Sequence, residues 1–253
     1  MNFIQCEFPS DTLHTYVQLT VLLPKTMATP LMQPRQKDCY PVLYLLHGAL
    51  ESGNNWVYRT DLAQLVDQKE MAVVLPFVGN SFYLDEPEGL PYFTYLTEEL
   101  PEYLGRTFPL SSSREETFIG GLSMGGYGSL YAALRKPWQY GKVFSLSGAM
   151  DIRTTASFVS NCGAPLPSQL RCRKALHGGP YDIFPLVEQA ELQAMPSLFL
   201  ACGTEDALIR DNRLMVQALE NRGIPFTYQE GPGGHDWGFW RPWLNRAVSF
   251  LIP

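Results

Sequence analysis

The sequence lacks the features of nucleic-acid-binding and membrane proteins. Only 17% of its 253 residues are charged, 19 Lys and Arg against 25 Asp and Glu, and the basic residues are scattered. Binding to a phosphate backbone needs clustered basic side chains that displace counterions, so nucleic acid is not an expected partner. No apolar run reaches the roughly 18 to 20 residues of a membrane helix, and the first ten residues have no basic start and no apolar signal core. We therefore expect a cytoplasmic protein that does not bind membranes.

Cysteine is also scarce. The five cysteines are odd in number and form no C-x-x-C pair, in a chain long enough to fold without cross-links. Neither disulfides nor a structural zinc ion is expected. The sequence is instead 45% hydrophobic and 13% aromatic, which predicts one globular domain over residues 1–253 with a buried core.

Short apolar segments alternate with amphipathic ones along the chain. Strands are expected over 13–23, 41–46, 71–77, 116–121, 142–146, 197–202 and 225–230. Most of these segments are almost continuously apolar, which is typical of strands covered on both faces. Helices are expected over 55–67, 92–107 with a bend at Pro101, 124–135, 209–221 and about 237–251. This order predicts an α/β fold with a mostly parallel central sheet, helices on both faces and an antiparallel N-terminal edge.

Residues 149–195 interrupt this alternation. They form the longest stretch without a clear strand, and they contain Gly, Pro and Cys. In an α/β sheet this stretch falls where an insertion can cover the C-terminal edge of the strands. We expect a lid or a pocket-shaping insertion here, not a second domain.

The strongest chemical signal is a G-x-S-x-G motif at Gly121, Ser123 and Gly125. It lies between a predicted strand and a predicted helix, the context in which such a serine is a nucleophile. The sharp turn strains the serine backbone, and the two glycines let the strand and the helix pass closely. The free N–H groups of the helix start favour a developing oxyanion. The competing interpretation is a glycine-rich helix start with an ordinary surface serine.

A serine nucleophile needs a histidine base, and the chain offers four histidines. His14 lies in a predicted strand and favours a structural role, while His177 lies in the irregular segment 149–195. His47 follows an apolar strand, where its ring would brace an oxyanion loop. His235 lies late in the chain, between a predicted strand and the last helix, as the chain order Ser, acid, His requires. We predict His235 as the base; a capping or tryptophan-packed histidine is the alternative.

The acid is expected in the loop after the strand 197–202. Asp206 is our choice there, to hold the imidazole in the tautomer that accepts the serine proton. Glu205 is the neighbouring alternative, because spacing alone does not say which carboxylate faces the imidazole, and Asp182 is a more distant one. A helix N-cap is the competing role for Asp206.

Four segments of the chain resemble a known family. They are His47-Gly48 with Trp56 shortly behind, the run TFIGGLSMGGYG, Cys202-Gly203-x-x-Asp206 and Gly234-His235-x-Trp237. Together they are similar to the esterase D type of α/β-hydrolases, and most of all to the bacterial tributyrin esterases. The resemblance runs nearly end to end. The same group contains S-formylglutathione hydrolases and feruloyl or acetyl esterases.

The resemblance implies a carboxylesterase that needs no cofactor and no metal, with Ser123, Asp206 and His235 as its triad. It also implies that backbone N–H groups hold the oxyanion: that of Met124, and one from the HGAL turn. Many lipases have HGGG at this turn, so the second donor is open between Ala49 and Leu50.

The substrate is less defined by the sequence. Aromatic side chains, including the predicted substrate-binding residues Tyr127 and Trp237, could line a small acyl pocket or pack in the core; the others are Phe77, Phe82, Tyr83 and Trp240. We expect a small-molecule ester with a short acyl chain. An S-formylglutathione-type thioesterase, a feruloyl or acetyl esterase on sugar esters, an acyltransferase and a catalytically silent binding protein are the alternatives. No motif decides whether the chain forms a homo-oligomer.

Overall fold

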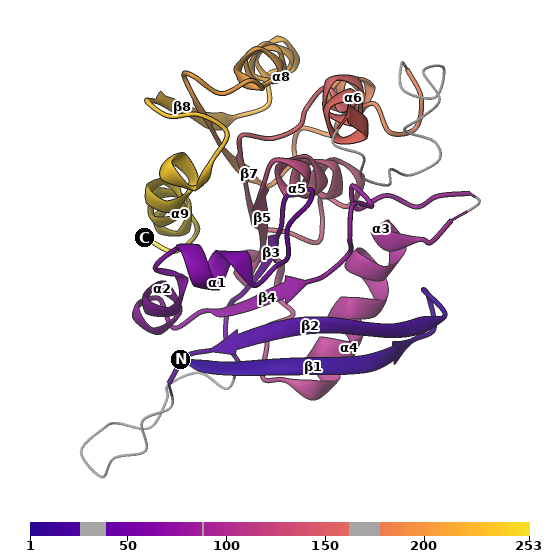
Figure 1. Ribbon diagram of the computed structural model, residues 1–253, viewed down its shortest axis with the longest axis vertical. Coiled ribbons are helices and arrows are strands. Elements are labelled where there is room, and N and C mark those ends of the chain that lie inside the picture. The colour runs from indigo at the N-terminus through magenta and orange to yellow at the C-terminus, as the bar shows by residue number, and fades with distance from the viewer. Residues whose placement is uncertain (26–38, 88, 162–177) are drawn as a thin grey trace.

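The computed structural model describes residues 1–25, 39–87, 89–161 and 178–253. Within these ranges one eight-stranded sheet runs through the molecule in the order β1-β2-β4-β3-β5-β6-β7-β8 (Figure 1). The strands are β1 Asn2–Ser10, β2 Thr15–Leu23, β3 Val42–Leu46, β4 Ala72–Pro76, β5 Thr117–Leu122, β6 Lys142–Leu146, β7 Ser197–Gly203 and β8 Phe226–Gly231. Seven of them lie within two residues of a predicted strand, and β1 is the one that the residue pattern did not delimit.

The sheet is parallel except at its N-terminal edge. Strand β2 pairs antiparallel with both β1 and β4, and every neighbouring pair from β4 to β8 is parallel. This confirms the predicted α/β fold. Parallel strands end at the same sheet edge, so the loops that follow β3, β5, β7 and β8 come together in space.

Helices cover both faces of the sheet (Figure 1). One face is covered by α1 Asn55–Arg59, α2 Leu62–Gln68 and α9 Trp237–Leu251, and the other mainly by α4 Leu100–Thr107, α5 Met124–Arg135, α7 Ile183–Gln189 and α8 Ile209–Arg222. Successive residues of β3 belong alternately to the two cores: Tyr44 to the one that contains residues of α4 and α5, and Leu45 to the one that contains residues of α2 and α9. This is the period of two that a strand buried on both faces requires.

Two predicted helices are interrupted for identifiable reasons. The segment 55–67 divides into α1 and α2 at Thr60, whose extended backbone ends α1 and whose hydroxyl accepts the N–H of Leu62 at 3.2 Å. The segment 92–107 passes from α3 Tyr92–Thr94 through a π-helical turn, Tyr95–Glu99, into α4. Pro101 has no N–H for the carbonyl of Thr97, which instead accepts from Gln139 Nε2 at 2.9 Å.

The irregular segment contains two helices that its sequence pattern did not predict, α6 Ile152–Asn161 and α7. Ile152 and Val159 of α6 and Ile183 and Val187 of α7 are all buried in the core on the α5 side of the sheet. Residues 162–177, with the His177 weighed as a base, lie outside the described residues, so the lid stays a prediction. No helix in the described ranges combines the length and the apolar character needed to span a membrane.

Candidate active site

Ser123 occupies a strained turn between β5 and α5. Its backbone lies in a left-handed region, with φ 53° and ψ −117°. Three backbone hydrogen bonds of 3.0 Å hold this conformation: Ser123 donates to the carbonyl of Leu146 and accepts from the N–H groups of Tyr127 and Ala149. A strained non-glycine residue persists only where its surroundings fix it. The turn presents the hydroxyl above the sheet edge with only 7% of the residue exposed.

The two glycines of the motif allow this turn to form. A Cβ on Gly121 would lie 2.7 Å from the backbone of Gly125 and from the carbonyl oxygen of Leu46. A Cβ on Gly125 would lie 2.5 Å from the same oxygen. Both distances are shorter than any side chain accepts, so strand β3, strand β5 and helix α5 approach this closely only because both positions are glycine.

His235 joins the serine to a buried carboxylate. Its Nε2 lies 2.9 Å from Ser123 Oγ, and its Nδ1 lies 3.0 Å from both carboxylate oxygens of Asp206. A carboxylate accepts hydrogen bonds, so these contacts assign the ring proton to Nδ1 and leave Nε2 free to accept the serine proton. Residues 112 positions apart in the chain, Ser123 and His235, thus share one hydrogen bond.

Asp206 is 2% exposed. Burial alone would raise the pKa of its carboxyl, but the hydrogen bond and charge of His235, the N–H of Leu208 and the hydroxyl of Ser147 together hold that pKa below its usual 3.8. The contact with Leu208 is 2.8 Å long, so the carboxylate both orients the imidazole and accepts from the chain entering α8. Ser147 in turn accepts from Trp240 Nε1 at 3.0 Å.

Glu205 and Asp182, the alternatives for the acid, point elsewhere. Glu205 accepts the N–H of Gly233 with its carboxylate and donates its own N–H to the carbonyl of Gly233 at 3.1 Å. It therefore fixes the loop that carries His235 rather than the imidazole itself. Asp182 caps α7, accepting from the N–H of Phe184 at 3.1 Å.

His47 braces the turn after β3. The N–H of Val78 donates to its Nε2 at 3.3 Å, so Nδ1 carries the proton and donates to the carbonyl of Gly48 at 2.8 Å. Tyr83 donates its hydroxyl to the carbonyl of His47 at 2.9 Å. Burial lowers the pKa of His47 to about 4, although the bond to Gly48 opposes this. The ring is thus neutral at neutral pH and links the turn after β3 to the segment after β4.

The structure separates the two candidates for the second oxyanion donor. Leu50, in the left-handed region at φ 64°, donates its N–H to Asn80 Oδ1 at 2.8 Å. Within the described part of the chain, the N–H groups of Ala49 and Met124 have no hydrogen-bond acceptor. Unused donors beside a nucleophile can stabilise a negative oxygen. This geometry favours Ala49 over Leu50.

The two predicted substrate-binding residues lie in different surroundings. Tyr127 is fully buried, and its hydroxyl donates to the carbonyl of Tyr181 at 2.7 Å, so it packs beneath the site. Trp237 is half-buried next to the loop of His235, and its Nε1 donates to Glu51 Oε1 at 2.8 Å. Its ring meets that of Trp240 edge-on at 5.4 Å.

Several side chains that support the site were not found from the sequence. Asn80 contacts Leu50 of the HGAL turn, Ser147 contacts Asp206, and Glu51 contacts Trp237 next to the loop of His235. Asn80 and Ser147 belong to no motif. Glu51 follows the HGAL turn directly, and this position was its only signal in the sequence.

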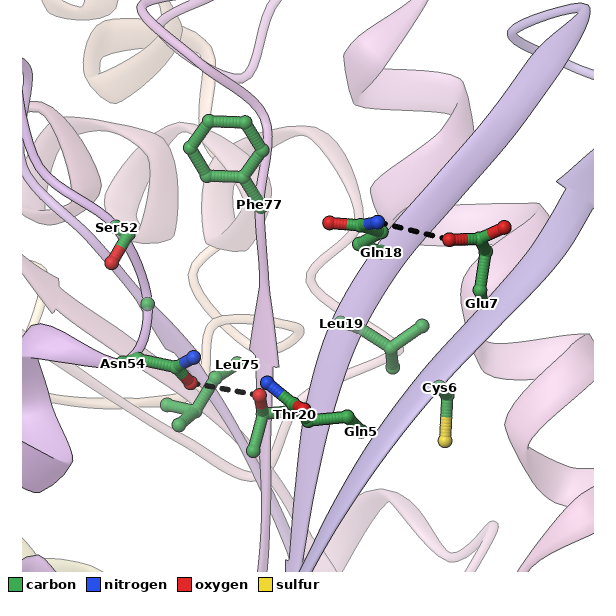
Figure 2. Close-up of a pocket in the computed structure, with 11 residues that line it drawn as sticks. Gln5, Cys6, Glu7, Gln18, Leu19, Thr20, Ser52, Asn54, Leu75 and Phe77 are labelled. Atoms are coloured by element: carbon green, nitrogen blue, oxygen red, sulfur yellow. Dashed lines mark hydrogen bonds between the residues drawn. The ribbon is translucent and has the colours of Figure 1, made fainter.

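A surface hollow of about 450 Å³ lies over β1, β2 and the end of β4, apart from the triad (Figure 2). Gln18 donates to Glu7 there at 2.9 Å, and Thr20 donates to Asn54 at 2.7 Å. The predicted triad, the oxyanion candidates, Tyr127 and Trp237 do not line it. Phe77, an aromatic candidate for the acyl pocket, lines this hollow instead.

Comparisons with known proteins agree on one family. Residues 10–251 match the esterase family, described as "Putative esterase". The chain is 32% identical over 261 residues to an acetyl esterase of Caldicellulosiruptor saccharolyticus, which covers 99% of this chain and 98% of that protein. It is 26% identical to the S-formylglutathione hydrolase of Bos taurus, over 76% of this chain and 75% of that protein. The substrate-bound structure of FphF, a fluorophosphonate-binding serine hydrolase of Staphylococcus aureus, superposes with a TM-score of 0.90 at 26% identity, covering 100% of this chain and 98% of that one.

Three of these four matches extend over almost the whole chain. The structure also joins a serine, a histidine and a carboxylate by hydrogen bonds at the edge of a largely parallel sheet. The chain belongs to the esterase family, as a carboxylic ester hydrolase with the α/β-hydrolase fold.

Proposed function

We propose that the enzyme hydrolyses short-chain acyl esters, roughly acetyl to butyryl, with Ser123 as nucleophile, His235 as base and Asp206 as the acid that orients it. The observation that carries this proposal is the continuous chain of hydrogen bonds from Ser123 Oγ through both imidazole nitrogens to Asp206, with contacts of 2.9 to 3.0 Å. Such distances suit direct proton transfer from a hydroxyl to a base.

The steps follow from the position of each group. His235 Nε2 takes the proton of Ser123 Oγ as that oxygen attacks the ester carbonyl, and the imidazolium then protonates the leaving alcohol. Water attacks the acyl-serine in the same way, which releases the carboxylic acid and restores the hydroxyl. Asp206 stabilises the imidazolium in both halves of the reaction. No cofactor enters these steps.

The developing oxyanion would be held by the backbone N–H groups of Met124 and Ala49. Met124 begins α5, so its N–H is one of the donors that a helix start leaves unused. Ala49 is preferred to Leu50 because Leu50 already donates to Asn80. Loss of one such donor reduces kcat by about 10²- to 10³-fold in enzymes of this type.

Alanine in place of Ser123 tests the mechanism. We expect turnover of p-nitrophenyl acetate to fall by at least about 10⁴-fold, while urea unfolding changes little because one oxygen is removed from a site near the surface. Labelling by a fluorophosphonate probe should be lost in parallel. Near-normal turnover by this variant would exclude Ser123 as nucleophile, and slow labelling of the wild type would favour the catalytically silent alternative.

The short acyl chain is supported by two observations. Ser123 is only 7% exposed, and a relative 32% identical to this chain is an acetyl esterase. We expect kcat/KM for p-nitrophenyl esters to be highest between acetyl and butyryl and to decline for longer chains. A maximum at octanoyl or beyond would contradict this. The narrower likeness to tributyrin esterases is tested by the same series.

A thioesterase acting on S-formylglutathione is the second candidate, favoured by the likeness to the bovine S-formylglutathione hydrolase. The same triad would serve, with a thiolate as the leaving group. Comparing kcat/KM for S-formylglutathione with the values for phenyl acetate, a feruloyl ester and a sugar acetate at one pH decides between a thioesterase and an esterase. Addition of an alcohol acceptor in the same assay detects acyl transfer, because product then moves from free acid to new ester.

We also infer a cytoplasmic site of action on a small-molecule ester, in keeping with the composition of the chain. Cell fractionation followed by fluorophosphonate labelling of each fraction tests the location. Light scattering of the purified protein gives the oligomeric state.

A further inference from the structure

A half-paired carboxyl group lies at the edge of the candidate active site. Glu51 follows the HGAL turn, and its Oε1 accepts from Trp237 Nε1 at 2.8 Å. Its second oxygen, Oε2, is buried and has no hydrogen-bond partner in the described part of the chain. Buried carboxylate oxygens are normally hydrogen-bonded, because desolvation without a partner is costly. An exception at this place calls for an explanation.

The unpaired oxygen faces the catalytic machinery. A Cβ on Gly48 would lie 3.6 Å from Glu51 Oε2 and 3.5 Å from Ser123 Cβ, so the carboxyl and the nucleophile flank the same point of the oxyanion turn. Two charged or titratable side chains interact electrostatically with Glu51: Arg59 from α1 and His235 from the loop before α9. The carboxyl thus lies close enough to sense the charge on the imidazole.

Trp237 connects this carboxyl to His235 through packed aromatic rings. It lies two residues after His235, at the start of α9. Its ring meets Trp240 edge-on, and Trp240 meets the imidazole of His235 edge-on with ring centres 5.0 Å apart and planes at 87°. Glu51 therefore holds one end of an aromatic cluster whose other end packs against the imidazole.

We propose that Glu51 is a positioning residue of the hydrolase, which ties the oxyanion turn to the loop of His235 through Trp237 and whose negative charge stabilises the imidazolium formed there. This inference rests on the proposed role of His235 as base. When His235 accepts the proton of Ser123, a positive charge appears beside Glu51, and an opposite charge nearby lowers the energy of that state. The ester itself is neutral, so the benefit arises in the transition state rather than in substrate binding.

The proposal has a distinctive dependence on pH. Burial raises the pKa of Glu51 above its usual 4.5, while the hydrogen bond from Trp237, the nearby amide of Asn55 and the charges of Arg59 and His235 oppose that rise. Glu51 is charged above its raised pKa and neutral below it. Its contribution to the rate is therefore present above that pKa and disappears as the pH falls through it.

The test compares wild type with Glu51→Gln from about pH 4.5 to 8, with circular dichroism to check that both stay folded. The amide oxygen can still accept from Trp237, so this variant removes the charge and keeps the hydrogen bond. We expect kcat at neutral pH to fall about three- to tenfold with KM for p-nitrophenyl acetate nearly unchanged. The ratio of the two kcat/KM values should fall towards one in acid.

Two further variants sharpen the result. Trp237→Phe removes a hydrogen bond that favours the charged carboxylate, so the step in the pH profile should move to higher pH. Glu7→Gln, which removes one negative charge in the hollow over β1, should leave the profile unchanged. In wild type the tryptophan fluorescence should change with pH as Glu51 titrates, and Trp237→Phe should remove most of this change; this measurement serves even if Glu51→Gln does not fold.

A ratio that is independent of pH, or turnover by Glu51→Gln equal to wild type throughout, would overturn the proposal. So would wild-type tryptophan fluorescence that shows no transition in this range. Failure of the underlying mechanism looks different, because His235→Ala would then keep its turnover. If His235→Ala loses turnover while Glu51→Gln does not, the triad stands and only the role of Glu51 is excluded.

Discussion

The nucleophile turn at Ser123 and the oxyanion turn at Gly48–Leu50 lie side by side and are built in opposite ways. Each contains a non-glycine residue in the left-handed region, Ser123 at φ 53° and Leu50 at φ 64°. Backbone hydrogen bonds and glycine contacts hold the first. Side chains from distant segments hold the second, among them Asn80 and Tyr83. A turn held by its own backbone is visible in a local motif, whereas one held by distant side chains is not.

The most severe way to break the nucleophile turn is to add a methyl group at Gly125. In Gly125→Ala the new Cβ would lie 2.5 Å from the carbonyl oxygen of Leu46 and 2.8 Å from that of His47, so β3 and α5 must separate. We expect a loss of about 3 kcal/mol or more in the free energy of unfolding, with turnover lowered more than about 100-fold. Urea unfolding and p-nitrophenyl acetate hydrolysis measure the two effects.

Gly105→Ala in α4 is the matched control. A Cβ there meets nothing within 4 Å. Alanine is the better helix residue, so this change should stabilise by about 0.5 to 1 kcal/mol. Equal behaviour of the two variants would show that the close approach at Gly125 does not matter.

The oxyanion turn should instead be sensitive to acid, through His47. Burial lowers the pKa of this histidine to about 4, against 6.5 in the unfolded chain. Between these values the unfolded chain binds a proton that the folded one does not, so the free energy of unfolding falls as the pH decreases. The full difference corresponds to about 3 kcal/mol.

The measurement is urea unfolding of wild type and His47→Gln at pH values between about 7 and 4.5. The variant should be less stable at neutral pH, because its side chain cannot replace both contacts of the ring. The difference between the two proteins should shrink in acid. A difference that stays constant over this range would mean that His47 does not titrate as its burial requires.

The same contrast explains which parts of the site could be predicted from the sequence. Strand β5, Ser123 and helix α5 were predicted almost to the residue, because glycine spacing and apolar runs are local signals. The choice between Asp206 and Glu205 could not be made from spacing alone. Only the structure shows that the carboxylate of Asp206 faces the imidazole. Donor choice at the HGAL turn was likewise open, since it depends on Asn80, thirty residues from Leu50.

Replacing Asn80 tests whether the oxyanion turn depends on that distant contact. Asn80→Ala removes the acceptor of the Leu50 N–H. The turn can then relax, and the N–H of Ala49 no longer points towards the oxyanion. We expect kcat to fall about tenfold, less than the loss of a whole donor, with little change in KM. Asn80→Asp keeps an acceptor and should restore most of the rate. If both variants match wild type, the turn is held by its other contacts alone.

The smallest effect is expected at Tyr83, whose hydroxyl donates to the carbonyl of His47 from a fully buried position. Tyr83→Phe deletes only this hydrogen bond and keeps the ring that packs on Gly128, so the loss in unfolding free energy should be about 0.5 to 1.5 kcal/mol. Tyr58→Phe, at a residue 72% exposed, is the control and should change nothing measurable. Because the carbonyl of His47 begins the oxyanion turn, Tyr83→Phe should also lower kcat slightly, whereas a pure packing role would lower stability alone. The two measurements together decide whether the hydroxyl of Tyr83 only stabilises the fold or also orients the N–H of Ala49.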